Sequence, residues 1–107
     1  GKQVKQFLNH IAQKGGDSVG GVRFTIKNER AVQIQINNRP LQPDSSYWLV
    51  TNDYVAEGGD GLDVFTERQR FMSTGQKIRD VIIAHLERKQ QEGEIITARK
   101  DGRIRYE

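Results

Sequence analysis

One short segment carries most of the side chains that could do chemistry in this sequence. Residues 51–65 read TNDYVAEGGDGLDVF and combine one tyrosine, three glycines and four acidic residues. An aromatic ring such as that of Tyr54 can lie flat on a nucleobase, and each stack is worth about 1–3 kcal/mol. The carboxylate of Asp60 can accept two charge-assisted hydrogen bonds from a vicinal diol such as a ribose. Together the two side chains predict a nucleoside site that tolerates several bases.

The glycines between these side chains suit a backbone that comes close to a ligand. Gly58 and Gly59 adopt positive φ at little cost, and their N–H groups would lie near the bound nucleoside. The same residues also fit an ordinary tight connection with Tyr54 in the core or at its rim, so both interpretations stay open on spacing alone. The glycine pattern is not the dinucleotide fingerprint, and no lysine follows it as a phosphate loop requires.

The other polar side chains lack the neighbours that catalysis requires. His10 and His85 have no histidine or acidic residue at metal-ligand spacing. The serines have no nearby base, so the residues needed for a nucleophilic triad are missing. Two-metal phosphate chemistry needs a cluster of His, Asp and Asn ligands. We therefore expect no catalytic residue, metal or other cofactor in this chain, and a catalytic centre elsewhere.

Composition indicates one modest domain. The chain has 107 residues, 35% hydrophobic and 29% charged, with a net charge of +3 and no cysteine. Basic residues are interleaved with acidic ones, which is typical of a solvated surface. No apolar run approaches the roughly 20 residues that span a bilayer. We expect neither a nucleic-acid partner nor a membrane span.

The hydrophobic periodicity predicts an α+β fold: a mostly antiparallel sheet packed with two main helices. Residues 2–14 place four apolar side chains on one helical face, and two glycines end the helix. Two alternating runs at 22–27 and 32–36, joined by Asn28-Glu29-Arg30, predict a hairpin with one face on the core. Val22, Phe24 and Ile26 define that face in the first run. Val32, Ile34 and Ile36 define it in the second.

Further along, the pattern predicts more strand and a second helix. Residues 47–51, YWLVT, have no polar alternation and are expected to form a strand covered on both faces, with Trp48 in the core. Val64 and Phe65 follow as a short strand or packed loop end. Ser73 or Thr74 is expected to cap a helix that runs to about Gln91, and Gly93 is expected to stop it. The apolar stripe of this helix comprises Ile78, Val81, Ile82 and Leu86. The terminal GRIRYE is expected to add a last strand, with Ile104 and Tyr106 on one face.

The run YWLVTNDYVAEGGDGLDVF, with VGGVRFTIK and RPLQPDSSY before it, resembles the C-terminal domain of the 5′-nucleotidase family. This resemblance implies that Tyr54 stacks on the base and that Asp60 binds the ribose hydroxyls. It also implies a separate N-terminal metallophosphoesterase domain, with two divalent metal ions, that hydrolyses the phosphate ester in nucleotide catabolism. Family members are typically exported, which implies a periplasmic or cell-surface location.

Two departures from the family pattern bear on these expectations. The turn before the GGVRF strand, residues 16–19, carries no aromatic. Either the stack on the base is one-sided, with weaker base affinity, or another ring such as Phe65 or Trp48 substitutes. No NSGGIR-like segment with a substrate arginine is present, and Arg23 is interpreted as an outward strand residue. The chain also opens directly on a helix. We therefore expect residues 1–107 to be the back portion of a 5′-nucleotidase C-terminal domain.

Two alternatives remain at this point. The first is a basic, non-enzymatic module that binds single-stranded nucleic acid on its sheet face, with strong salt dependence. That face would carry Arg23, Lys27, Gln33 and Gln35, with Tyr47 or Tyr106 for stacking. The other alternative is a structural fragment that binds nothing alone.

Overall fold

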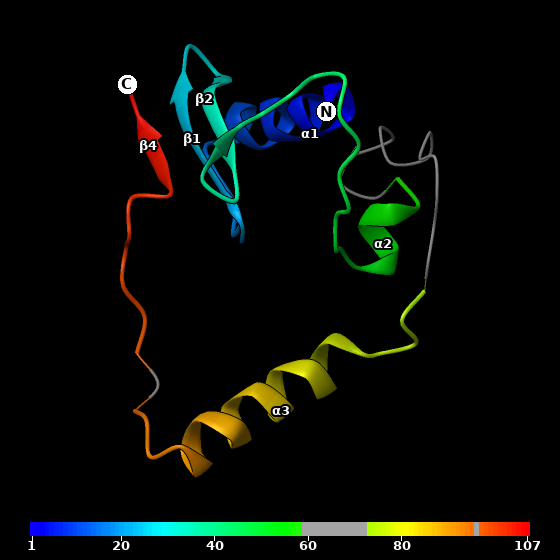
Figure 1. The fold of residues 1–107 in the computed structure, drawn as a ribbon, viewed down its shortest axis with the longest axis vertical. Helices are drawn as coiled ribbons and strands as arrows, with labels where there is room; N and C mark the ends of the chain where they lie inside the picture. Colours follow the sequence, from blue (N-terminus) through cyan, green and yellow to red (C-terminus); the bar gives the residue numbers. More distant parts are fainter. Residues whose placement is uncertain (59–72, 96) are drawn as a thin grey trace. The chain divides into compact units, whose positions relative to one another are not determined.

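A computed structural model describes residues 1–58, 73–95 and 97–107 (Figure 1). The chain divides into two compact units, Gly1–Glu67 with Asp101–Glu107 and Arg68–Lys100. The elements of the first unit are α1 (Lys2–Gln13), β1 (Val22–Lys27), β2 (Arg30–Ile36), β3 (Arg39–Pro40), α2 (Asp53–Ala56) and β4 (Ile104–Tyr106). The second unit contains α3 (Ile78–Gln91).

The first helix forms as its apolar spacing predicts. Leu8 and Ile11 are fully buried, while Val4 and Phe7 pack partly buried beside them. At its C-terminal end, the N–H of Gly15 donates to Ala12 O and that of Gly16 to Ile11 O. This pair of hydrogen bonds is the Schellman motif, in which the residue after the C-cap, here Gly15, adopts positive φ. The φ values of 88° and 121° at the two glycines explain why they end the helix.

The predicted hairpin is confirmed, and a third short strand extends it. β1 and β2 pair antiparallel, with Lys27 opposite Arg30 and a two-residue turn at Asn28 and Glu29. Both turn residues have positive φ, as a type I′ hairpin requires. A second two-residue turn with positive φ then leads to β3, which pairs antiparallel with the end of β2. Proline is tolerated in β3 because the strand lies at the edge of the sheet.

A bulge in β2 corrects the predicted face of Val32. Arg23 pairs with Gln35 but Thr25 pairs with Val32, so two residues of β2 oppose one of β1. Gln33 has a φ of 53°, a conformation that β-bulges accommodate. The extra residue reverses the alternation, and Val32 therefore shares the face of Thr25 rather than that of Ile34. Ala31, which is 2% exposed, takes the core position instead.

The last strand forms as expected and makes the sheet mixed. β4 pairs parallel with β1, with Phe24 opposite Ile104 and Ile26 opposite Tyr106, and the sheet order is β3-β2-β1-β4. This register places both β4 side chains on the α1 face. The Tyr106 hydroxyl donates to Gly15 O at 2.9 Å, which joins the end of the chain to the end of α1.

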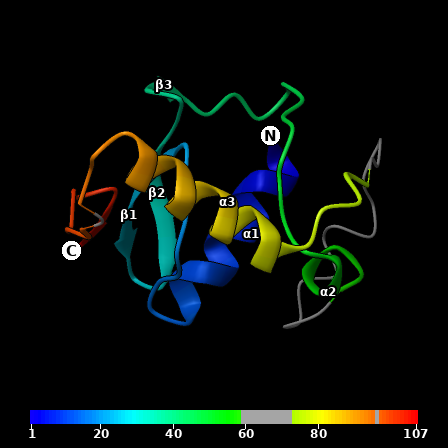
Figure 2. The ribbon, with the colours of Figure 1, turned by 90° about the horizontal axis from the view of Figure 1, so that it is seen from below.

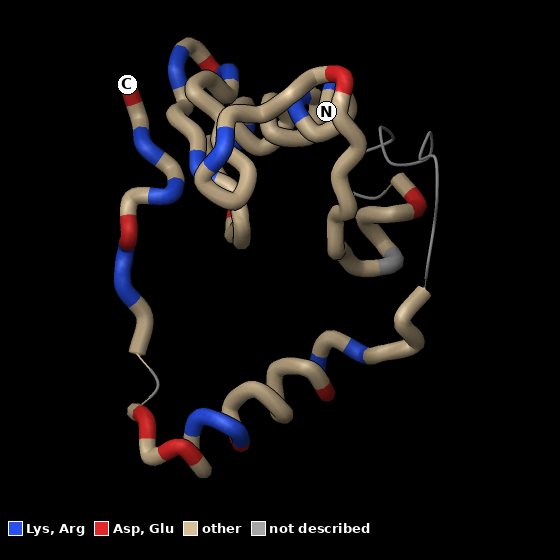
Figure 3. Tube along the Cα trace, viewed as in Figure 1, with Lys and Arg blue, Asp and Glu red and all other residues tan. Residues whose placement is uncertain are grey.

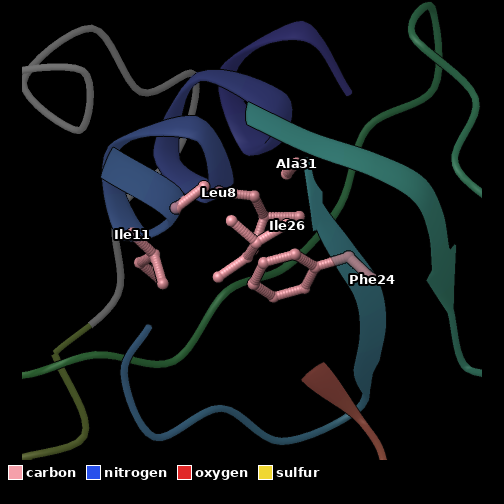
Figure 4. Packing of buried hydrophobic residues seen from close by; sticks show 6 residues of the cluster. Leu8, Ile11, Phe24, Ile26 and Ala31 are labelled. Carbon is pink, nitrogen blue, oxygen red and sulfur yellow. The ribbon is translucent and has the colours of Figure 1, made fainter. Parts of the chain in front are cut away.

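The core lies between α1 and one face of this sheet, which confirms the α+β prediction. Figure 4 shows Leu8 and Ile11 of α1 facing Phe24, Ile26 and Ala31 of the hairpin. The amide side chain of Asn9 also joins the two layers, because its Oδ1 accepts the Ala31 N–H at 2.9 Å.

Residues 47–51 do not form the predicted double-covered strand. After a turn at residues 43–45, the chain continues to α2 (Figures 1 and 2), and no strand is assigned in this part of the described residues. Trp48 is 71% exposed and Val50 94%, so the expected core position of Trp48 is wrong. A strand needs a neighbour to accept and donate its ladder hydrogen bonds. The described part of the chain supplies no such neighbour to this segment.

In the second unit, α3 begins later than predicted. Lys77 is its N-cap residue and makes no side-chain capping bond. Ser73 and Thr74 instead accept the backbone N–H groups two residues on, from Gly75 at 3.3 Å and Gln76 at 3.2 Å, so the predicted cap is wrong. These local turns compete with helix formation. Gly93, with a φ of 73°, ends α3 as expected.

The apolar stripe of α3 is present, but its members are exposed. Ile78, Val81, Ile82 and Leu86 are between 41% and 55% exposed, and no α3 side chain is buried. Within the described residues, no helix is both long enough and apolar enough to cross a bilayer.

Candidate functional site

Tyr54 lies on a one-turn helix rather than in an open loop. α2 comprises only residues 53–56, and its first turn is closed by Asn52. The Asn52 Oδ1 accepts the Val55 N–H at 2.8 Å, and the Asn52 backbone carbonyl accepts the Ala56 N–H at 3.0 Å. Asn52 is therefore an N-cap residue, in the geometry that asparagine favours.

The ring of Tyr54 is open to solvent. Tyr54 is 65% exposed, whereas Ala56 on the same turn is only 7% exposed. The turn thus buries its alanine and presents its tyrosine. An exposed ring can meet a planar ligand without repacking a core, which an ordinary core tyrosine could not do.

The glycine segment begins where the turn ends. Gly58 has a φ of 96°, and its N–H donates to Val55 O at 3.1 Å. This conformation favours glycine, as the sequence predicts. Gly59 and Asp60 lie outside the residues that the structure describes, as do Val64 and Phe65. The placement of Asp60 relative to Tyr54 therefore remains a prediction.

Trp48, the second candidate ring, lines a separate apolar pocket. This pocket has a volume of about 370 Å³. Its wall consists of Val4, Gly20, Gly21, Val22, Ile36, Tyr47, Trp48, Leu49 and Val50. Tyr47 is anchored because its hydroxyl accepts the Gln42 N–H at 2.9 Å. Tyr54 does not line the pocket, so the structure does not bring the two rings into one wall.

Arg23 is an outward strand residue, as predicted, and it is tied to the end of the chain. Its guanidinium donates to the Asp101 backbone O at 3.2 Å and lies 4.0 Å from the Asp101 carboxylate. Arg103 donates to both Asp101 carboxylate oxygens, and also to Val19 O at 2.6 Å. The charge-assisted bonds from Arg103 hold the pKa of Asp101 well below its ordinary value.

Sequence reasoning missed this cluster, although the alternating charges of ARKDGRIRYE contained a signal for it. Lys27, the other basic residue named for the nucleic-acid alternative, lies 3.8 Å from the Glu107 carboxylate. Figure 3 shows both signs of charge distributed along the chain. The face that a nucleic acid would have to use is therefore partly neutralised, which weighs against the alternative function.

Metal-ligating side chains do not gather in the part of the chain that the structure describes. No group of three or more His, Cys, Asp or Glu side chains there could hold a metal ion. His85 instead lies 3.2 Å from the Arg88 guanidinium through its Nδ1 atom.

The geometry defines a small α+β domain that presents an exposed tyrosine on a capped turn. The chain belongs to the family described as 5′-nucleotidase, C-terminal domain, whose model matches residues 1–67. This confirms the resemblance found in the sequence and places the chain in a family of nucleotide hydrolases.

Three relatives illustrate this kinship. A 5′-nucleotidase of Vibrio parahaemolyticus is 29% identical over 81% of the chain and 16% of its own length. The trifunctional nucleotide phosphoesterase protein YfkN of Bacillus subtilis is 28% identical over 98% of the chain and 8% of its own length. The cell wall protein Lmo0130 of Listeria monocytogenes is 31% identical over 63% of the chain and 8% of its own length. The chain thus spans less than a fifth of each relative.

Proposed function

We propose that this chain is the nucleoside-recognition part of a 5′-nucleotidase-like phosphoester hydrolase. Tyr54 stacks on the base and Asp60 accepts hydrogen bonds from the ribose hydroxyls. The backbone N–H groups of Gly58 and Gly59 lie next to the sugar. The observation that carries the proposal is the exposed ring of Tyr54 on a capped turn that leads directly into GGDG. Membership of the nucleotidase family supports the same conclusion.

In this proposal, hydrolysis takes place on a different domain. The named site residues include no base paired to a nucleophile, and the described residues form no metal-ligand group. A separate N-terminal metallophosphoesterase domain with two divalent ions would supply the catalytic centre, and the chain would serve nucleotide catabolism. The relatives are all much longer than the matched part, which leaves room for such a domain in them.

We also propose an extracytoplasmic location, in the periplasm or at the cell surface. The support comes from the relatives, one of which is described as a cell wall protein. Fractionation of the cells that make the protein, with an antibody against this chain, would test the location. Recovery in the cytoplasmic fraction alone would contradict it.

The ligand prediction is tested with adenosine. Titration of the 107-residue chain should shift the amide resonances of residues 54–60 and yield a dissociation constant. Tyr54→Ala should weaken binding by roughly 5- to 150-fold, which corresponds to the 1–3 kcal/mol of one lost stack. Tyr54→Phe keeps the ring and should bind nearly as well as the wild type.

Two controls sharpen this experiment. Asp60→Asn should weaken the binding of adenosine more than the binding of 2′,3′-dideoxyadenosine, because the dideoxy compound lacks the diol. An oligonucleotide whose affinity falls steeply with salt would favour the nucleic-acid alternative. Wild-type protein that shows no shift at the loop with about 1 mM adenosine, an affinity near −4 kcal/mol, would contradict the proposal.

A further inference from the structure

Asn52 caps the helix that carries Tyr54, and the proposed function gives it no role. Its side chain accepts the Val55 N–H at 2.8 Å and its carbonyl accepts the Ala56 N–H at 3.0 Å. Tyr54 is one of the two residues between the cap and the first capped amide. Both of these hydrogen bonds, from the Val55 and Ala56 amides, end on Asn52.

Such a short turn needs its cap. Isolated helices shorter than about 12–15 residues are marginal in water, because nucleation fixes several backbone angles for a single hydrogen bond. α2 has four residues. Its other end is closed by the N–H of Gly58, which donates to Val55 O at 3.1 Å. The side-chain bond of Asn52 therefore contributes to holding the turn.

The orientation of the ring depends on this backbone. Tyr54 is 65% exposed and thus has limited packing of its own. Ala56 is buried and keeps one side of the turn toward the interior. The direction in which the ring leaves the turn is set by the turn itself, and loss of the cap would let the ring sample other directions.

We propose that Asn52 is a positioning residue for nucleoside binding, which holds the one-turn helix that presents Tyr54 to the base. This inference rests on the proposed function, since it assigns Asn52 a role only if Tyr54 binds the ligand. Asn52 itself touches no ligand in this scheme. A pre-formed turn spares the ligand the cost of ordering it, and so raises affinity.

The test compares Asn52→Ala with Asn52→Ser in the 107-residue chain, with adenosine as the probe. Alanine removes the cap, whereas serine restores a neutral acceptor of similar capping strength. Asn52→Ala should weaken adenosine binding by roughly 2- to 30-fold, and Asn52→Ser should recover most of it. In the absence of ligand, the Val55 amide should exchange with solvent faster in Asn52→Ala and at the wild-type rate in Asn52→Ser.

Asn9→Ala is the matched control. It removes an equivalent bond, from the Ala31 N–H to Asn9 Oδ1 at 2.9 Å, between α1 and β2. It should lower the melting temperature and leave adenosine affinity unchanged. Equal weakening by Asn9→Ala would attribute the effect to general stability and overturn the inference.

The remaining outcomes separate the two proposals. If Tyr54→Ala loses binding but Asn52→Ala retains it, the nucleoside site stands and the positioning role of Asn52 is overturned. If adenosine binds wild type and Tyr54→Ala equally, or not at all, the proposed function fails and the role of Asn52 fails with it.

Discussion

The chemistry of this chain depends on how individual side chains near residue 54 are presented. Tyr54 is exposed because the turn that carries it buries Ala56 instead. Gly58, four residues on, adopts a φ of 96° that side chains rarely accept. The backbone conformation at these residues leads into the segment that carries Asp60.

Gly58→Ala should therefore weaken adenosine binding. A residue with a Cβ pays about 1–2 kcal/mol in the left-handed region, so the loss should be at most about 5- to 30-fold. Isothermal titration would measure it. Gly15→Ala is the control, because Gly15 has a φ of 88°, has nothing within 4 Å of an added Cβ and ends α1 rather than the site turn. Gly15→Ala should lower stability only. Unchanged adenosine affinity in Gly58→Ala would show that the backbone at this residue does not shape the site.

Among the elements, β4 depends on contacts between residues far apart in the sequence. Only three residues long, it pairs parallel with β1 at the edge of the sheet. The Tyr106 hydroxyl bonds the end of α1, and the Asp101–Arg103 pair bonds β1 and Val19 O. A short edge strand of this kind needs such side-chain contacts to stay paired.

Asp101→Asn should lower the melting temperature near neutral pH. The pKa of Asp101 is depressed in the folded chain, mainly by its hydrogen bonds from Arg103. Its stabilisation is therefore present above the unfolded pKa of about 3.9 and is lost as the pH falls below that value toward the folded pKa. Melting curves of wild type and variant should consequently converge in strong acid.

Asp44→Asn provides the comparison for this pH series. The Asp44 side chain is 95% exposed and lies 3.9 Å from the Lys2 Nζ, an arrangement that contributes little to stability. Its melting curve should follow that of wild type at every pH. A constant difference between wild type and Asp101→Asn down to strong acid would show that the ionised carboxylate is not what stabilises β4.

For the whole molecule, the proposed division of labour between domains has a measurable consequence. The proposed site residues Tyr54, Gly58, Gly59 and Asp60 include no cation for a phosphate group. AMP and adenosine should therefore bind the 107-residue chain with dissociation constants within about threefold of each other, at low and at physiological salt. The chain should release no phosphate from AMP with added Mn²⁺ or Zn²⁺.

Binding competition and a phosphate-release assay measure the two parts of this prediction. The Vibrio parahaemolyticus 5′-nucleotidase, assayed in parallel, serves as the positive control for release. Phosphate release by the chain itself, abolished by a chelator, would place a catalytic centre in this chain and contradict the proposal that hydrolysis takes place on a separate domain.

Local patterns were enough to predict α1, the β1–β2 hairpin, β4 and the glycine that ends α3. In each case the signal lies in the elements' own residues: apolar spacing, turn residues that accept positive φ, and glycine at a helix end. The sequence alone likewise identified Tyr54 and the aspartate of GGDG as candidate ligand-binding residues.

The folded arrangement was needed for everything that depends on a partner elsewhere in the chain. The bulge at Gln33 moves Val32 off the core face, because pairing with β1 requires it. Trp48 is exposed because residues 47–51 have strand-forming side chains but no neighbouring strand to pair with among the described residues. Sequence patterns record what a residue prefers, whereas the fold decides which partner is present to satisfy it.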